Sequence, residues 1–87
     1  MERIVAAAIQ YDGTTISLPR PARHAHVQWC ALQGMLDKEQ VSYAVQGFLT
    51  SEGRFANRIE AKNIAHIAGQ ELKRVNDGIE LFSEDLW

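Results

Sequence analysis

The stretch Gly47–Ala65, GFLTSEGRFANRIEAKNIA, joins a hairpin to a helix and decides the expected fold. An apolar run ends at Leu49, and residues 50–53 have the composition of a tight turn whose glycine can adopt positive φ. After a short return strand, Asn57 can cap a helix, and Glu60 can bond back to the cap amide. The stretch therefore predicts a hairpin that leads directly into a helix N-terminus, where free amides attract anions.

The first half of the chain predicts the same plan. RIVAAAIQY (3–11) alternates as a strand with two apolar faces, and Asp12-Gly13 indicates a two-residue hairpin turn into the β-branched TTISL. Pro21 suits the first turn of a helix, which we expect from about Ala22 to Met35. Apolar residues at helical spacing predict its buried face: Ala22, Ala25, Trp29, Leu32 and Leu36.

The second half completes an α+β outline. We expect a strand over 41–49, the hairpin, and a helix from Arg58 to about Arg74 with Gly69 inside it. Its expected buried face contains Ala61, Ile64, Ala65, Ala68 and Leu72. The remaining tail, IELFSEDLW, is too apolar to stay in water, so we expect it to pack on the body or on a neighbouring subunit. The prediction is a single domain, 1–87, with a ββα-ββα arrangement and a short C-terminal tail.

The composition is that of an ordinary globular protein, with 46% hydrophobic and 23% charged residues among 87. A chain of this size buries roughly 60 to 65% of its unfolded surface, so association with other copies would stabilise it. No apolar run approaches the length of a membrane span. Because Cys30 is the single cysteine, we expect no internal disulfide and a reducing, cytoplasmic location.

The distribution of charge is more informative than the net charge of −2, which argues against binding a nucleic-acid polymer. No Asp or Glu occurs in Thr14–Leu36, although two arginines and two histidines do, and nine of the 11 acidic residues lie from Asp37 onward. An anion-binding surface needs such a region. A chance cluster of arginines on a solvated loop is the alternative interpretation.

Arg20, Arg23 and His24 stand at or before the N-terminus of the first expected helix. The helix dipole disfavours positive charge there unless an anion is bound. Guanidinium groups together with free amides are the usual ligands of a phosphate or pyrophosphate. The sequence PRPARH lacks the glycines of a P-loop or dinucleotide-binding motif, so it indicates an anion and no particular ligand.

The start of the second helix offers further candidates. Arg54 and Arg58 can hold phosphate, and Phe48 can stack on a base. Phenylalanines in strands are more often part of the core, and Asn57 can either cap the helix or contact a base edge. Both interpretations stay open for each residue.

Catalytic and metal-site patterns are weak. His26 and Cys30 lie one helical turn apart, but a zinc site needs further ligands that no spacing supplies, so packing near the core is the preferred interpretation. The serines lack a nucleophile elbow, and no pair of carboxylates is spaced for acid and base roles. We therefore expect a protein that is not an enzyme and that uses no metal or cofactor.

Three stretches carry a family resemblance: RIVAAAIQYDGTTISLPRPARHAH, QGFLTSEGRFANRIEAKNIAHIAGQ and LFSEDLW. Through them the sequence resembles the Thoeris anti-defence sponges, phage proteins that sequester signalling nucleotides of a bacterial immune system. The resemblance implies binding of a cyclised ADP-ribose second messenger, without cleavage, at a subunit interface in the cytoplasm of the host bacterium. It also implies a homo-oligomer between dimer and hexamer, and some members hold cyclic oligonucleotides at separate sites.

The resemblance also assigns residues. It matches Arg23 and Arg74 to phosphate contacts, and Phe48 and Asn57 to positions near the base. Charge and helix position alone add three further candidates to this ligand set: Arg20, His24 and Arg58.

Two alternatives belong to other functional classes. The first is a small phage or bacterial structural or regulatory homo-oligomer, in which the basic helix N-terminus meets a carboxylate of a protein partner. The second is a metal-dependent nuclease or phosphodiesterase using His24 and His26, which the incomplete ligand set disfavours.

Overall fold

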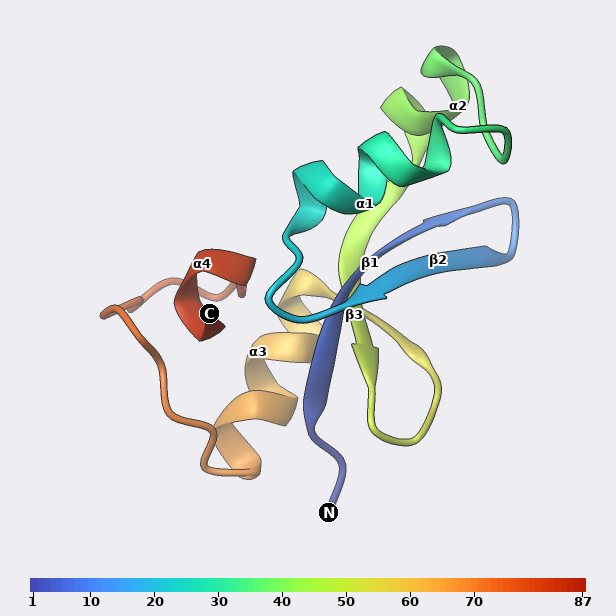
Figure 1. Cartoon of the computed structure of the whole chain (residues 1–87). Helices are drawn as coiled ribbons and strands as arrows, with labels where there is room; N and C mark the ends of the chain where they lie inside the picture. The colour runs from blue at the N-terminus through green and yellow to red at the C-terminus, as the bar shows by residue number, and fades with distance from the viewer.

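The computed structural model describes all residues, 1–87, and contains one four-stranded antiparallel sheet with four short helices (Figure 1). The elements, in chain order, are β1 (Ile4–Tyr11), β2 (Thr14–Pro19), α1 (His24–Ala31), α2 (Lys38–Tyr43), β3 (Val45–Thr50), β4 (Phe55–Asn57), α3 (Arg58–Ile67) and α4 (Ser83–Leu86). The strand order is β2-β1-β3-β4, so the two hairpins join through β1 and β3. The α+β class is confirmed.

The turn chemistry of both hairpins follows the sequence. Asp12 and Gly13 have φ values of 48° and 78°, as a two-residue turn between twisted strands requires. Gly53, in the second hairpin, has a φ of 82°, and its N–H donates to the Thr50 carbonyl at 2.9 Å. The two predicted hairpins are therefore confirmed.

The core lies against one face of the sheet. Ala7 and Ile9 of β1 face it together with their cross-strand partners Phe48 and Ile16. The strands also contribute Ile4 and Ala56, and the helices and the C-terminal residues supply the rest of this core: Val27, Ala31, Ala61, Ala65, Leu81, Leu86 and Trp87. Within it, α1 packs on β1 and β2, whereas α3 packs on β3 and β4.

The first helix differs from its prediction in both length and face. It begins at His24 and ends at Ala31, and Gly34, with a φ of 124°, lies in the turns that follow. Its buried residues are His24, Val27 and Ala31, whereas Trp29, expected in the core, is 67% exposed. The prediction that the buried face of this helix contains Trp29 was wrong. The face with His24 is buried instead, because the His24 side chain has a hydrogen-bond partner inside the protein.

A helix, α2, occupies residues where the sequence predicted a loop and the beginning of a strand. The Asp37 carboxylate accepts from the N–H of Gln40 at 2.8 Å, and the Gln40 side chain accepts from the N–H of Asp37 at 2.9 Å. This reciprocal cap stabilises a helix start. The strand β3 consequently begins at Val45 and not at Val41.

Helix α3 begins as predicted and ends early. The Asn57 side chain accepts from the N–H groups of Ile59 and Glu60 at 3.0 and 2.8 Å, and the Glu60 carboxylate accepts from the N–H of Asn57 at 3.0 Å. The capping box is therefore confirmed. Gly69, at φ 68°, terminates the helix, because its own N–H and that of Gln70 bond back to carbonyls of the last turn. The prediction that this helix extends to about Arg74 was therefore wrong, because α3 ends at Ile67.

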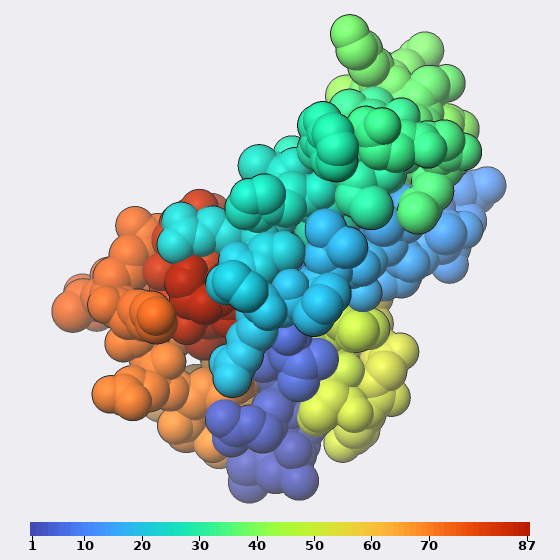
Figure 2. Space-filling view, in the orientation of Figure 1, coloured from blue at the N-terminus to red at the C-terminus, as the bar shows by residue number.

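Residues 81–87, which we call the C-terminal segment, pack back on the body and include α4. Leu81 is fully buried, and Trp87 is 8% exposed. In the space-filling view the red atoms of this segment lie between the orange residues that precede it and the teal residues near α1 (Figure 2). The apolar tail is thus part of the core.

The opposite sheet face has its own close contact, at Gly47. Ala8 pairs with Gly47 across the strands and is fully buried. A methyl group at Gly47 would overlap the main-chain oxygen of Ala56 and the ring of Phe55. The backbone of a paired strand cannot move away, so this position requires glycine.

We therefore predict that Gly47→Ala lowers the free energy of unfolding by about 1 to 3 kcal/mol, the usual cost of overpacking. Urea denaturation measures it. The double variant Gly47→Ala/Phe55→Leu relieves the contact with the ring but not the one with Ala56, and it should stay destabilised. Stability equal to that of the natural sequence in the single variant would contradict this account.

Candidate functional site

Five of the seven predicted ligand residues contact the C-terminal segment, and the other two, His24 and Asn57, have their partners elsewhere. Arg23 donates from Nη2 to the main-chain oxygen of Trp87 at 2.7 Å. The guanidinium carbon of Arg20 lies 6.0 Å from the centroid of the Trp87 ring, within the range of a cation–π contact. The indole Nε1 of Trp87 donates to the Ala22 carbonyl at 2.9 Å. Residues 20–23 are thus held against the far end of the chain.

Below this surface, three rings are in edge contact. The centroids of His24 and Phe48 are 5.0 Å apart, and those of Phe48 and Trp87 are 6.5 Å apart, both at 83°. Phe48 is fully buried, so in this structure it supports Trp87 from the core side and does not reach solvent.

His24 is a buried neutral donor. Its Nε2 donates to the Gly47 carbonyl at 2.6 Å, which requires the tautomer protonated at Nε2. Burial lowers the pKa of His24 below its ordinary value and outweighs the opposing effect of the Gly47 hydrogen bond, and the nearby Arg58 charge also lowers it. The imidazole therefore serves the fold and carries no positive charge at neutral pH.

Arg58 also contacts the C-terminal segment, from the start of α3. It donates from Nε to the Leu81 carbonyl at 3.2 Å and from Nη2 to Gln46 Oε1 at 2.8 Å. Its guanidinium carbon lies 4.9 Å from the centroid of the Phe82 ring. Burial lowers the pKa of Arg58, against the attraction of Glu80 and Glu84.

A hollow of about 250 Å³ lies at the same helix start. Its lining residues are Val45, Gln46, Asn57, Arg58, Ile59 and Glu80. The Asn57 side-chain oxygen is already used by the two helix amides, so its capping role is confirmed and a contact with a ligand stays a prediction.

Arg74 pairs with the C-terminal segment through carboxylates. Its Nε donates to Asp85 Oδ1 at 2.6 Å, and its Nη2 lies 3.8 Å from Glu84 Oε2. The fully buried Asp85 carboxylate also accepts from the Asn76 amide and from the Phe82 N–H. Burial by itself would raise the pKa of Asp85, but these hydrogen bonds together hold it below the usual value.

Arg20 and Arg23 differ from Arg74 in their electrostatic surroundings. Neither is paired with an Asp or Glu side chain, whereas Arg74 and the remote Arg54 each are. The first turn of α1 contains no acidic residue either. The acid-free stretch of sequence has therefore become a surface with two guanidinium groups that no Asp or Glu side chain pairs with.

His26 has a role that the sequence did not reveal. It is exposed, and its Nδ1 accepts from the Arg23 N–H at 2.9 Å, so it caps α1 from the third helical position. The expectation that it packs near the core was wrong, whereas Cys30 is half-buried. No three His, Cys, Asp or Glu side chains are grouped as metal ligands would be.

Sequence reasoning missed the residues that organise the site. Trp87 contacts both exposed arginines, and Asp85 fixes Arg74 and Asn76. Only the apolar composition of the tail indicated that it packs on the body or on a neighbouring subunit, and nothing local indicated which residues it would meet.

A model of the phage T4 y16D protein family matches residues 3–87. The chain belongs to the phage T4 y16D protein family. Among curated proteins and solved structures, none matches the chain significantly. Membership in the y16D family agrees with the phage origin that the resemblance implied. No helix of this member is both long enough and apolar enough to cross a bilayer.

The lowered pKa of His24 predicts a pH dependence of stability. The unfolded chain takes up a proton near pH 6.5, whereas the buried imidazole resists it until the pH is lower. The free energy of unfolding should therefore be greatest above that pH and fall as the pH drops below about 6.5.

The variant His24→Gln keeps a donor for the Gly47 carbonyl but cannot titrate. Its free energy of unfolding should therefore change less steeply with pH than that of the natural sequence. Urea denaturation across the pH range measures the slope for this variant and for the natural sequence. Equal slopes in His24→Gln and the natural sequence would contradict the assignment.

Proposed function

We propose that this protein binds and sequesters a cyclised ADP-ribose immune signal without cleaving it, and so acts as a phage anti-defence protein. The observation that carries the proposal is the pair Arg20 and Arg23, two exposed arginines that no Asp or Glu side chain pairs with, both held against Trp87. The family resemblance implies the same function, and membership in the y16D family supports the phage part of the proposal.

The chemistry of this pair suits a pyrophosphate. Guanidinium groups form paired, charge-assisted hydrogen bonds to phosphate oxygens, and a cation without a neutralising partner gains most from an incoming anion. Arg23 uses Nη2 for Trp87, which leaves its other N–H groups available. Arg58, at the start of α3, contacts the C-terminal segment at Leu81 and offers a third guanidinium beside the 250 Å³ hollow.

The surroundings of the arginines favour binding over turnover. His24, the nearest titratable side chain along the sequence, is buried and bonded to Gly47, so it is not placed to act as a base toward a ligand on Arg20 and Arg23. Retention of the intact signal is the function that such a surface supports.

A second copy of the chain would complete the site. None of the hollows in the monomer includes Arg20 or Arg23, so a ligand held there would lie on an open surface. A subunit interface would enclose it, as the resemblance implies. Large apolar side chains are exposed and available for association, among them Trp29, Met35 and Tyr43. We therefore propose a homo-oligomer of at least two chains.

The test is recovery of the bound signal. The protein is incubated with excess cyclised ADP-ribose, freed of unbound ligand and heat-denatured, and the released molecules are identified by mass spectrometry. We expect the signal unchanged, in an amount that does not exceed the protein, and light scattering should give a mass of at least twice 9.8 kDa. Arg23→Glu should lose binding, because the charge that meets the phosphate is reversed.

Lys38→Glu is the matched control, since it makes the same charge change at an exposed position on α2. It should bind like the natural sequence, and circular dichroism should show both variants folded. Absence of retained ligand in the natural protein would overturn the proposal. Recovery of linear ADP-ribose in molar excess over the protein would show that the protein cleaves the signal and is an enzyme.

A further inference from the structure

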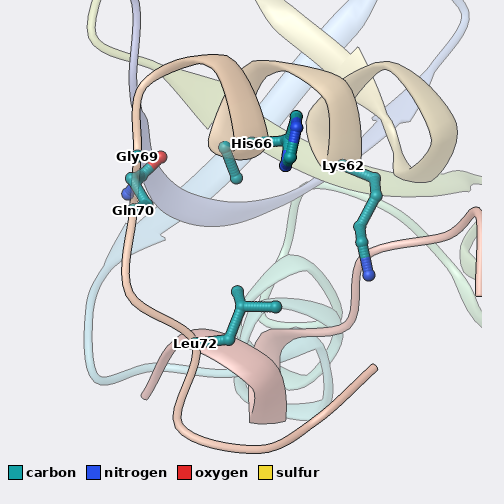
Figure 3. Close-up of a pocket in the computed structure, with 6 residues that line it drawn as sticks. Lys62, His66, Gly69, Gln70 and Leu72 are labelled. Carbon is teal, nitrogen blue, oxygen red and sulfur yellow. The ribbon is translucent and has the colours of Figure 1, made fainter. Parts of the chain in front are cut away.

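A second groove lies away from Arg20 and Arg23, between α3 and the residues that follow it, 70–79 (Figure 3). It contains two hollows, of about 320 and 340 Å³, that share Lys62 and His66. The first is completed by Ala65, Gly69, Gln70 and Leu72, and the second by Ile59, Asn63, Gly78 and Ile79. Each hollow has the volume of a small-ligand site.

The lining of the groove is free of acidic side chains, although most acidic residues of the chain lie in this half of the sequence. Lys62 and His66 are one helical turn apart and therefore lie on the same face of α3. The Lys62 ammonium donates to the Asn76 carbonyl, which leaves two of its three N–H groups for a ligand. The groove thus presents a cation and an imidazole, with no carboxylate among its lining residues.

Apolar side chains line the groove on both walls, Ile59 on α3 and Leu72 and Ile79 on the residues that follow it. Figure 3 shows Lys62 extending from α3 toward the residues that follow the helix, and Leu72 pointing back toward α3 from the other side. In the second hollow, Ile59 and Ile79 are 49% and 71% exposed. A ligand that covered these side chains while meeting Lys62 would be anionic at one end and apolar at the other.

The groove is held open by contacts that do not involve a ligand. The Gln70 side chain accepts from the Ile4 N–H at 2.7 Å and donates to the Ile4 carbonyl at 3.0 Å, which fixes the end of α3 to β1. Asn76 on the far wall is bonded to the buried Asp85. Both walls are therefore anchored to the body, and the hollows are preformed.

We infer that this groove binds a small organic anion, with its phosphate or carboxylate at Lys62 and His66 and its apolar body against Leu72. This site is separate from the proposed nucleotide site, and its test does not depend on that proposal.

Phenyl phosphate and benzoate are suitable probes, because they share a ring and differ in the anionic group. Each is titrated into the isotope-labelled full chain, and amide and side-chain NMR shifts are followed. At least one probe should move the signals of Lys62, His66 and Leu72 in a saturable way. Whichever binds more tightly identifies the anion, and inorganic phosphate without a ring should bind at least about tenfold more weakly.

The variants His66→Gln and Lys62→Gln should each weaken binding by about tenfold, the loss expected for one hydrogen bond to a charged group. Lys38→Gln, on α2, removes an equivalent charge elsewhere and should bind as before. Because Lys62 also bridges to Asn76, His66→Gln keeps the test valid should Lys62→Gln alter the groove.

The inference is overturned if neither phenyl phosphate nor benzoate moves these signals at about 10 mM, a concentration at which even millimolar affinity would be visible. It is equally overturned if the shifts map to Arg20 and Arg23, or if all variants bind like the natural chain.

Discussion

The structure depends on one buried carboxylate, that of Asp85. It is fully inaccessible and accepts hydrogen bonds from Arg74, from Asn76 and from the Phe82 N–H. A buried charge is tolerated only when such partners replace water, so the three donors and the carboxylate require one another. Through them α4 is fixed to Arg74 and Asn76 in the residues after α3. No buried polar side-chain atom of the protein is left without a hydrogen-bond partner.

The placement of the arginines follows from this constraint. With Asp85 anchored, Trp87 enters the core beside Phe48 and His24, and its main-chain oxygen and ring hold Arg23 and Arg20 at the surface. The candidate binding residues are thus positioned by a segment from the other end of the chain. Folding and the proposed binding of a nucleotide signal are linked because the same C-terminal segment serves both.

Local chemistry explains what could be predicted from the sequence. The Asp12-Gly13 turn and the Asn57 capping box use neighbouring residues only, and both are present as expected. The buried face of α1 was predicted wrongly, because burial of His24 depends on the carbonyl of Gly47, 23 residues away. Convergence of the arginines on Trp87 depends on pairs more than 60 residues apart, such as Arg23 and Trp87, which no local pattern reports.

The most direct test is Asp85→Asn in a Trp29→Phe background, where Trp87 is the only tryptophan and reports on the C-terminal segment. Urea denaturation should show that the free energy of unfolding falls by about 1 to 3 kcal/mol, because the three donors lose a charged acceptor. The fall is limited because Arg74 is half-exposed and its ion pair is partly screened by solvent. Trp87 fluorescence in the folded variant should shift toward that of an exposed indole. Stability and emission equal to those of the Trp29→Phe parent would contradict the account.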